Sequence, residues 1–262
     1  MEVLEERKAP AGLNPIMSIY VIALLYFFVN VFVFLGSRSY IPVIMVWNVF
    51  LAALPLVFAR GVHKVVEKPE GVKSKRFKAV LLSLLWFFFF PNAPYLVTDF
   101  IHIRGERFFS DFSEVPLIQE QNPLMSYPPQ SYPSTPSAEN AAYPADLLAW
   151  LKLTDIGLGV FLGTMAGLAS LYILHRLLLK RKKVLLAHGL VAVNCLISGY
   201  AIYIGRFLRY NSWDVLKPVK LLNSLMSNIN LFTLQFSLLF AGYIFAAYWI
   251  FYAFMNSSEK IE

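Results

Sequence analysis

The chain has 262 residues, of which 58% are hydrophobic and only 15% charged, whereas a soluble domain carries about 25% charged residues. The hydrophobic residues lie in runs too long for the core helices of a soluble domain, so the composition excludes a soluble globular protein. A net charge of +7 is what basic cytoplasmic loops give a membrane protein, and no nucleic-acid partner is expected.

Six segments reach the roughly 20 apolar residues that a membrane-spanning helix needs. The runs are continuously apolar, without the alternation of a transmembrane barrel strand. We therefore predict an all-α polytopic membrane protein in which residues 1–262 form a single six-helix membrane domain. The expected spans are Pro15–Leu35, Ser39–Ala59, Ala79–Thr98, Asp155–Leu174, Val184–Gly205 and Leu231–Phe254.

Basic residues predict the orientation of these spans. Seven lie between Arg60 and Lys78, and five lie in the short turn Arg176–Lys183. Because cytoplasmic loops carry the excess of Lys and Arg, both of these connections should be cytoplasmic. Both termini are then cytoplasmic too, and we expect a multi-pass protein of the cell membrane.

A long extracytoplasmic loop, residues 105–150, should be inserted between the third and fourth spans. Its middle, Pro116–Pro144, is rich in Pro, Ser, Gln and Tyr. Such a composition cannot bury enough apolar surface to fold alone, so a flexible, partly polyproline segment is expected. The alternative is a peptide-like ligand for a Pro-binding domain.

Polar residues collect first at the end of the third span. Pro91 and Pro94 remove amide donors and should kink this helix, and Asn92 is placed to bond the freed carbonyls. On a continuing helix one face would be shared by Asn92, Tyr95, Asp99 and His102. The set is either a kink with the groups that repair it or part of a functional site.

A second polar group is Asp155, at the expected start of the fourth span. Three glycines follow it at four-residue steps, Gly159, Gly163 and Gly167. Small residues at this spacing let helices approach closely, so Asp155 should point into the bundle rather than to lipid. The alternative for Asp155 is an interfacial helix cap.

The third polar group is at the end of the fifth span. Arg206 and Arg209 share a helix face and suit a carboxylate or a phosphate, and Asn211 and Asp214 follow them. The alternative is that the arginines reach lipid phosphates from the helix end.

Two of these segments resemble signatures of a known family. The first is Trp86-Phe-Phe-Phe-Phe-Pro-Asn-Ala-Pro-Tyr-Leu-Val-Thr-Asp99, and the second is Ile204-Gly-Arg-Phe-Leu-Arg-Tyr-Asn-Ser-Trp-Asp214. Both resemble the prokaryotic membrane family catalogued as domain of unknown function 1361, over roughly the second to sixth spans. A tryptophan-aromatic-Asp element of that family matches at Asp155, where Leu153-Thr154 replaces the aromatic pair. The resemblance implies an integral membrane protein of the six-helix type and carries no known activity.

The predicted orientation places all three polar groups at the outer interface, which leaves two hypotheses. In the first, an outward-facing site binds or processes an anionic or lipid-headgroup ligand that bears a phosphate. Ligand-binding candidates are Asn92, Tyr95, Arg206, Arg209 and Asn211; catalytic candidates, if the protein is an enzyme, are Asp99, His102, Asp155 and Asp214. No resident metal or cofactor is expected, because Asp-x-x-His alone is not a zinc motif, although the carboxylates would suit a divalent cation.

In the second hypothesis the same residues form inter-helix salt bridges and hydrogen bonds in a structural membrane subunit or scaffold. The pairs expected on this reading are Asp155 with Arg206 and Asp99 with Arg209. Under either hypothesis the bilayer itself is the principal partner.

Overall fold

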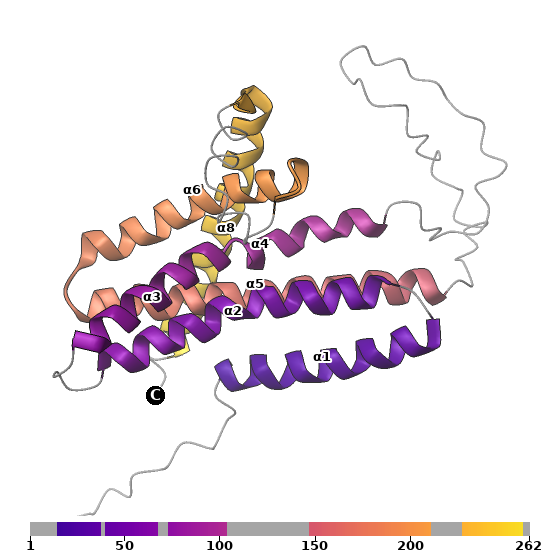
Figure 1. The fold of residues 1–262 in the computed structure, drawn as a ribbon, viewed down its shortest axis with the longest axis horizontal. Helices are drawn as coiled ribbons and strands as arrows, with labels where there is room; N and C mark the ends of the chain where they lie inside the picture. Colours follow the sequence, from indigo (N-terminus) through magenta and orange to yellow (C-terminus); the bar gives the residue numbers. More distant parts are fainter. Residues whose placement is uncertain (1–14, 38–39, 68–72, 104–146, 211–226, 259–262) are drawn as a thin grey trace, which may run out of the picture. The chain divides into compact units, whose positions relative to one another are not determined.

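The computed structural model describes residues 15–37, 40–67, 73–103, 147–210 and 227–258. These residues form helices and contain no strand, which confirms the predicted all-α class (Figure 1). The elements are α1 (Pro15–Ser37), α2 (Ile41–Glu67), α3 (Lys73–Phe89), α4 (Asn92–Tyr95), the 3₁₀-helix η1 (Leu96–Ile103), α5 (Leu147–Lys180), α6 (Val184–Phe207) and α8 (Leu231–Ser258).

Six helical segments in the described part of the chain are long and apolar enough to cross a membrane, as predicted. They are Met17–Leu35, Ile41–Glu67, Lys75–Ile103, Ala149–Lys180, Val184–Phe207 and Leu231–Ser257. Large apolar side chains on them face outward, among them Phe32, Leu185 and Leu239. This exposure would promote aggregation in water, whereas a lipid environment covers it at no cost.

The fourth predicted span begins earlier than expected. The helix that contains it, α5, starts at Leu147, and the span itself starts at Ala149 rather than at Asp155. The predicted Pro-rich loop, residues 105–150, lies outside the described residues except for positions 147–150, which belong to α5.

The chain divides into two compact units, Met1–Phe100 with Asp155–Glu262 and Ile101–Thr154. In the first unit α2 packs against α1, α3 and α4, and α6 packs against α4 and α8. Its core contains large buried side chains such as Trp86, Phe90 and Tyr248. The indole nitrogen of Trp86 donates to Ser170 Oγ at 3.0 Å, so this polar atom is satisfied inside the core.

The glycine stripe of α5 packs closely, as its spacing predicts. A Cβ atom at Gly159 would lie 2.6 Å from Met45 Cε, and one at Gly163 would lie 2.7 Å from Leu96 Cδ2. A Cβ atom at Gly167 would lie 2.5 Å from Ala93 Cβ, closer than two carbon atoms can come. The absence of side chains on this face therefore sets how closely α2, α4 and η1 approach α5.

Candidate functional site: a polar network among the spans

The two prolines end α3 and start a different helical geometry. α3 stops at Phe89, and after a turn at Pro91 the chain continues as α4 and then as the 3₁₀-helix η1. Asn92 Nδ2 donates to the carbonyl oxygen of Phe89 at 2.9 Å, which confirms its expected role in repairing the break. The predicted kink is thus present, and it changes which residues of η1 share a face.

Residues three apart share a face in a 3₁₀-helix, whereas residues three and four apart share one in an α-helix. Tyr95 is therefore aligned with Thr98, whose hydroxyl donates to the Tyr95 carbonyl oxygen at 2.7 Å. Asp99 is buried, at 1% exposed, and like Tyr95 it contacts Arg206. The single continuous face predicted for Asn92, Tyr95, Asp99 and His102 does not form, because the helix type changes within it.

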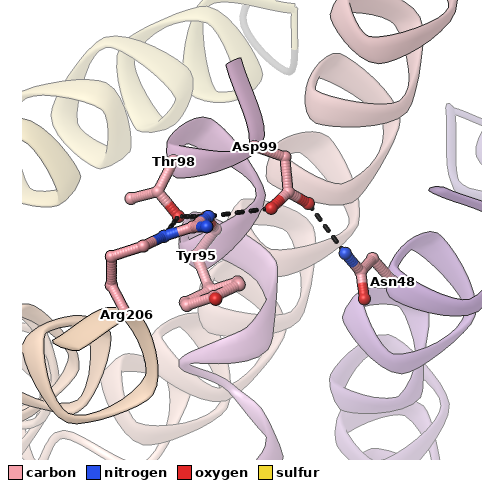
Figure 2. Close-up of polar contacts among 5 residues, drawn as sticks. All are labelled: Asn48, Tyr95, Thr98, Asp99 and Arg206. Atoms are coloured by element: carbon pink, nitrogen blue, oxygen red, sulfur yellow. Dashed lines mark hydrogen bonds and ion pairs between the residues drawn. The ribbon is translucent and has the colours of Figure 1, made fainter. Parts of the chain in front are cut away.

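Asp99 is the centre of a network that joins three elements (Figure 2). Its Oδ1 accepts a hydrogen bond from Arg206 Nη2 of α6 at 2.8 Å, which is also an ion pair. Its Oδ2 accepts one from Asn48 Nδ2 of α2, also at 2.8 Å. Both carboxylate oxygens are therefore bonded to side chains of other helices.

The guanidinium group of Arg206 also contacts Thr98 and Tyr95. Its Nε donates to Thr98 Oγ1 at 3.0 Å, and its Nη2 contacts the same oxygen. Its guanidinium carbon lies 4.8 Å from the centre of the Tyr95 ring, within the range of a cation–π interaction. A Cβ atom at Gly205 would lie 3.0 Å from Tyr95 Cε2, so glycine at this position leaves room for the ring.

The Asp99–Arg206 pair is buried unevenly. The side chain of Asp99 is 2% exposed and that of Arg206 17% exposed. Taking such a pair out of water is costly, and it is tolerated when further hydrogen bonds satisfy both groups, as Asn48 and Thr98 do here. Loss of either charge would leave the other buried without compensation.

Asp155 points into the bundle, as expected, but its contacts are with α1. Its Oδ1 accepts from Asn30 Nδ2 at 2.9 Å, and its backbone carbonyl oxygen accepts from the Tyr26 hydroxyl at 3.1 Å. It is not a helix cap, since α5 begins two turns earlier at Leu147. The alternative reading of Asp155 as a cap is therefore wrong.

The partners of the two acids differ from the expected ones. Asp99 forms an ion pair with Arg206 rather than with Arg209, and Asp155 contacts Asn30 rather than Arg206. The partners of the two aspartates depend on which helices are adjacent in the bundle. A position along the span does not reveal which helices these are.

The remaining candidates lie at exposed positions or outside the described residues. Arg209 is exposed beyond the end of α6, with a left-handed φ of 56°. His102 is exposed near the end of η1. Asn211 and Asp214 lie outside the described residues.

Four polar residues that contact Asp155, Asp99 or Arg206 were missed in the sequence: Tyr26, Asn30, Asn48 and Thr98. The two asparagines carried a usable signal, because each is an amide inside an otherwise apolar span, where an unpaired polar group is expensive. Tyr26 and Thr98 carried no comparable signal, since both residue types occur commonly in apolar helices.

No group of three His, Cys, Asp or Glu side chains in the described ranges is arranged to hold a metal ion. The absence of a resident cofactor stays a prediction. The carboxylates of Asp99 and Asp155 are engaged by nitrogen donors, which compete with any cation for the same oxygens.

Comparison with known proteins gives one result. A family model described as a protein of unknown function (DUF1361) matches residues 47–247, which include the motifs around Asp99 and Arg206. No curated protein and no solved structure matches. The match covers well over half of the chain, and the six apolar helices make it a multi-pass membrane protein. The chain therefore belongs to the DUF1361 family of proteins of unknown function.

Proposed function

We propose that the protein is a structural subunit or scaffold of the membrane, in which Asp99 and its partners lock three helical elements together. The observation that carries the proposal is that both carboxylate oxygens of Asp99 accept hydrogen bonds from other helices. Its two oxygens are bonded to Arg206 and Asn48, and the residue is 1% exposed. A carboxylate occupied in this way fixes helices, whereas a catalytic acid or a ligand-binding group needs a side open to its substrate.

We place this lock at the extracytoplasmic side of the cell membrane, with both termini in the cytoplasm. The support is the charge distribution of the connections. The α2–α3 connection and the α5–α6 turn carry the basic clusters Arg60–Lys78 and Arg176–Lys183, and the lock lies toward the opposite ends of α2 and α6.

A second candidate is the binding or processing of an anionic ligand, such as a lipid headgroup that bears a phosphate. The observation that favours it is Arg209, which is exposed three residues beyond Arg206. The side chain of Arg206 is itself 17% exposed, so it is not fully enclosed. Two such groups at one helix end would suit a phosphate.

Thermal unfolding of Arg206→Gln and Arg209→Gln in lipid nanodiscs separates the two candidates. The lock predicts that Arg206→Gln lowers the free energy of unfolding by about 3 kcal/mol, because Asp99 is left buried without its cation. It also predicts that Arg209→Gln melts like the unchanged protein, because an exposed side chain is lost at little cost.

The lipid composition supplies the second arm of the experiment. If the protein binds phosphate headgroups through Arg209, nanodiscs of phosphatidylglycerol raise the melting temperature relative to phosphatidylcholine, and Arg209→Gln abolishes this increase. An Arg206→Gln variant as stable as the unchanged protein in both lipids would contradict the lock.

A further inference from the structure

The contact between α1 and α5 contains a carboxyl–amide pair with an imbalance of donors and acceptors. Asn30 uses both hydrogens of its amide nitrogen, one toward Asp155 Oδ1 at 2.9 Å and one toward the Tyr26 carbonyl oxygen at 3.1 Å. The other oxygens of the pair, Asn30 Oδ1 and Asp155 Oδ2, are buried and have no hydrogen-bond partner. Asn30 as a whole is 2% exposed. Two acceptors are thus left without a donor in the interior of a membrane protein, where this is costly.

The neighbouring groups do not supply the missing donor. The Tyr26 hydroxyl lies beside both the backbone carbonyl oxygen and the carboxyl group of Asp155, but it has a single proton, and its hydrogen bond at 3.1 Å is to the carbonyl oxygen. Among the described residues, the charged and titratable groups that act on this contact are Tyr26 of α1 and, through Tyr26, Asp99 of η1. Arg206, the cation of the network, is committed to Asp99 and Thr98. An ionised Asp155 would therefore be a negative charge without a cation.

One proton resolves the whole imbalance. When Asp155 carries a proton on Oδ2, the carboxyl group becomes a donor, and the acceptor it needs is available on the adjacent amide, Asn30 Oδ1. The Asn30 N–H already donates to Asp155 Oδ1. Carboxyl and amide then form a mutual pair in which each donates once and accepts once.

We propose that Asp155 is a proton-binding site at membrane depth, with its proton shared with the amide oxygen of Asn30. The proposal is independent of the Asp99–Arg206 lock. The surroundings of the two carboxyl groups differ accordingly: Asp99 is paired with a guanidinium group, whereas Asp155, neutral in this proposal, is paired with an amide.

The site has a consequence for α1. Among the side chains of α1 whose burial is described, those that are buried are Tyr26 and Asn30, and both contact Asp155. When the proton is removed, a carboxylate oxygen of Asp155 lies beside Asn30 Oδ1, and neither of these two acceptors has a donor. Proton release from Asp155 therefore weakens the attachment of α1 to α5.

Infrared difference spectroscopy on the full-length protein in nanodiscs tests the proposal. At neutral pH the protein should show the carbonyl stretch of a protonated carboxyl group, and this band should disappear as the pH is raised. The band should be lost in Asp155→Asn and kept in Asp99→Asn. A spectrum without the band, or a band that persists in Asp155→Asn, would overturn the proposal. Loss of the band on addition of sodium at constant pH would also overturn it, because this loss would indicate a cation site.

Thermal unfolding is the control that shows whether Asp155→Asn loses the carboxyl band only because it misfolds. Asp155→Asn should melt at or above the temperature of the unchanged protein at neutral pH, since the introduced amide can donate to Asn30 Oδ1 as the carboxyl proton does and no proton has to be taken up on folding. The folded state of the unchanged protein binds one proton more than the unfolded state at neutral pH, so its stability should fall as the pH rises. Asp155→Asn has no such proton and should lack that part of the fall. If it instead melts well below the unchanged protein at neutral pH, Asp155 acts as a charge and the proposal is wrong.

Discussion

Asp99→Asn should lower the free energy of unfolding by about 3–5 kcal/mol, the range found when one partner of a buried ion pair is removed. The substitution keeps the size of the side chain, but it takes the negative charge away from Arg206, which lies 2.8 Å from Asp99. The guanidinium group is then held beside Thr98 and Tyr95 without a counter-charge.

A double-mutant cycle measures how far the two charges depend on each other. Asp99→Asn combined with Arg206→Gln removes both charges, so the double variant should be clearly more stable than the sum of the single losses implies. Chemical or thermal unfolding in one detergent gives the four free energies. Additive losses would show that the two side chains do not interact and would contradict the lock.

Gly167→Ala should also be strongly destabilising, by about 1–3 kcal/mol, as expected when a methyl group is forced into a packed interior. The added Cβ would lie 2.5 Å from Ala93 Cβ, and Ala93 is fully buried with no rotamer by which it can move aside. Relief requires α4 to shift away from α5, which also displaces the start of η1.

Gly157→Ala is the matched control in the same helix. A Cβ atom at Gly157 has nothing within 4 Å, so this substitution gains helix propensity of about 1 kcal/mol and meets no neighbour. Melting temperatures of the two variants should therefore move in opposite directions. Equal shifts would mean that the stripe of α5 is not a close-packed face.

The spans and the break after α3 were predictable because they depend on local chemistry. Runs of about 20 apolar residues specify spans, and two prolines three residues apart remove two backbone donors wherever the helix lies. The inward direction of Asp155 was predictable too, because the glycines Gly159 and Gly163 marked the packed face of its helix.

The pairing of the polar residues was not predictable for two physical reasons. The chain changes to a 3₁₀-helix at Leu96, so the spacing of residues that share a face changes there, whereas the sequence spacing alone implied a continuing α-helix. In addition, the partners Asn30 and Asn48 come from spans whose lateral neighbours only the fold determines. The sequence shows how far along its own span each polar residue lies, whereas the neighbours of that residue around the bundle depend on the fold.

The most direct test of the network is a distance measurement that changes no residue. Solid-state nuclear magnetic resonance of the labelled protein in lipid can detect dipolar coupling between an arginine guanidinium nitrogen and an aspartate carboxyl carbon, with Asp99→Asn used only to assign the signal. The structure predicts coupling between Arg206 and Asp99, whose nitrogen and oxygen atoms are 2.8 Å apart. Absence of this coupling, with the Arg206 signal close to lipid phosphate instead, would contradict the account.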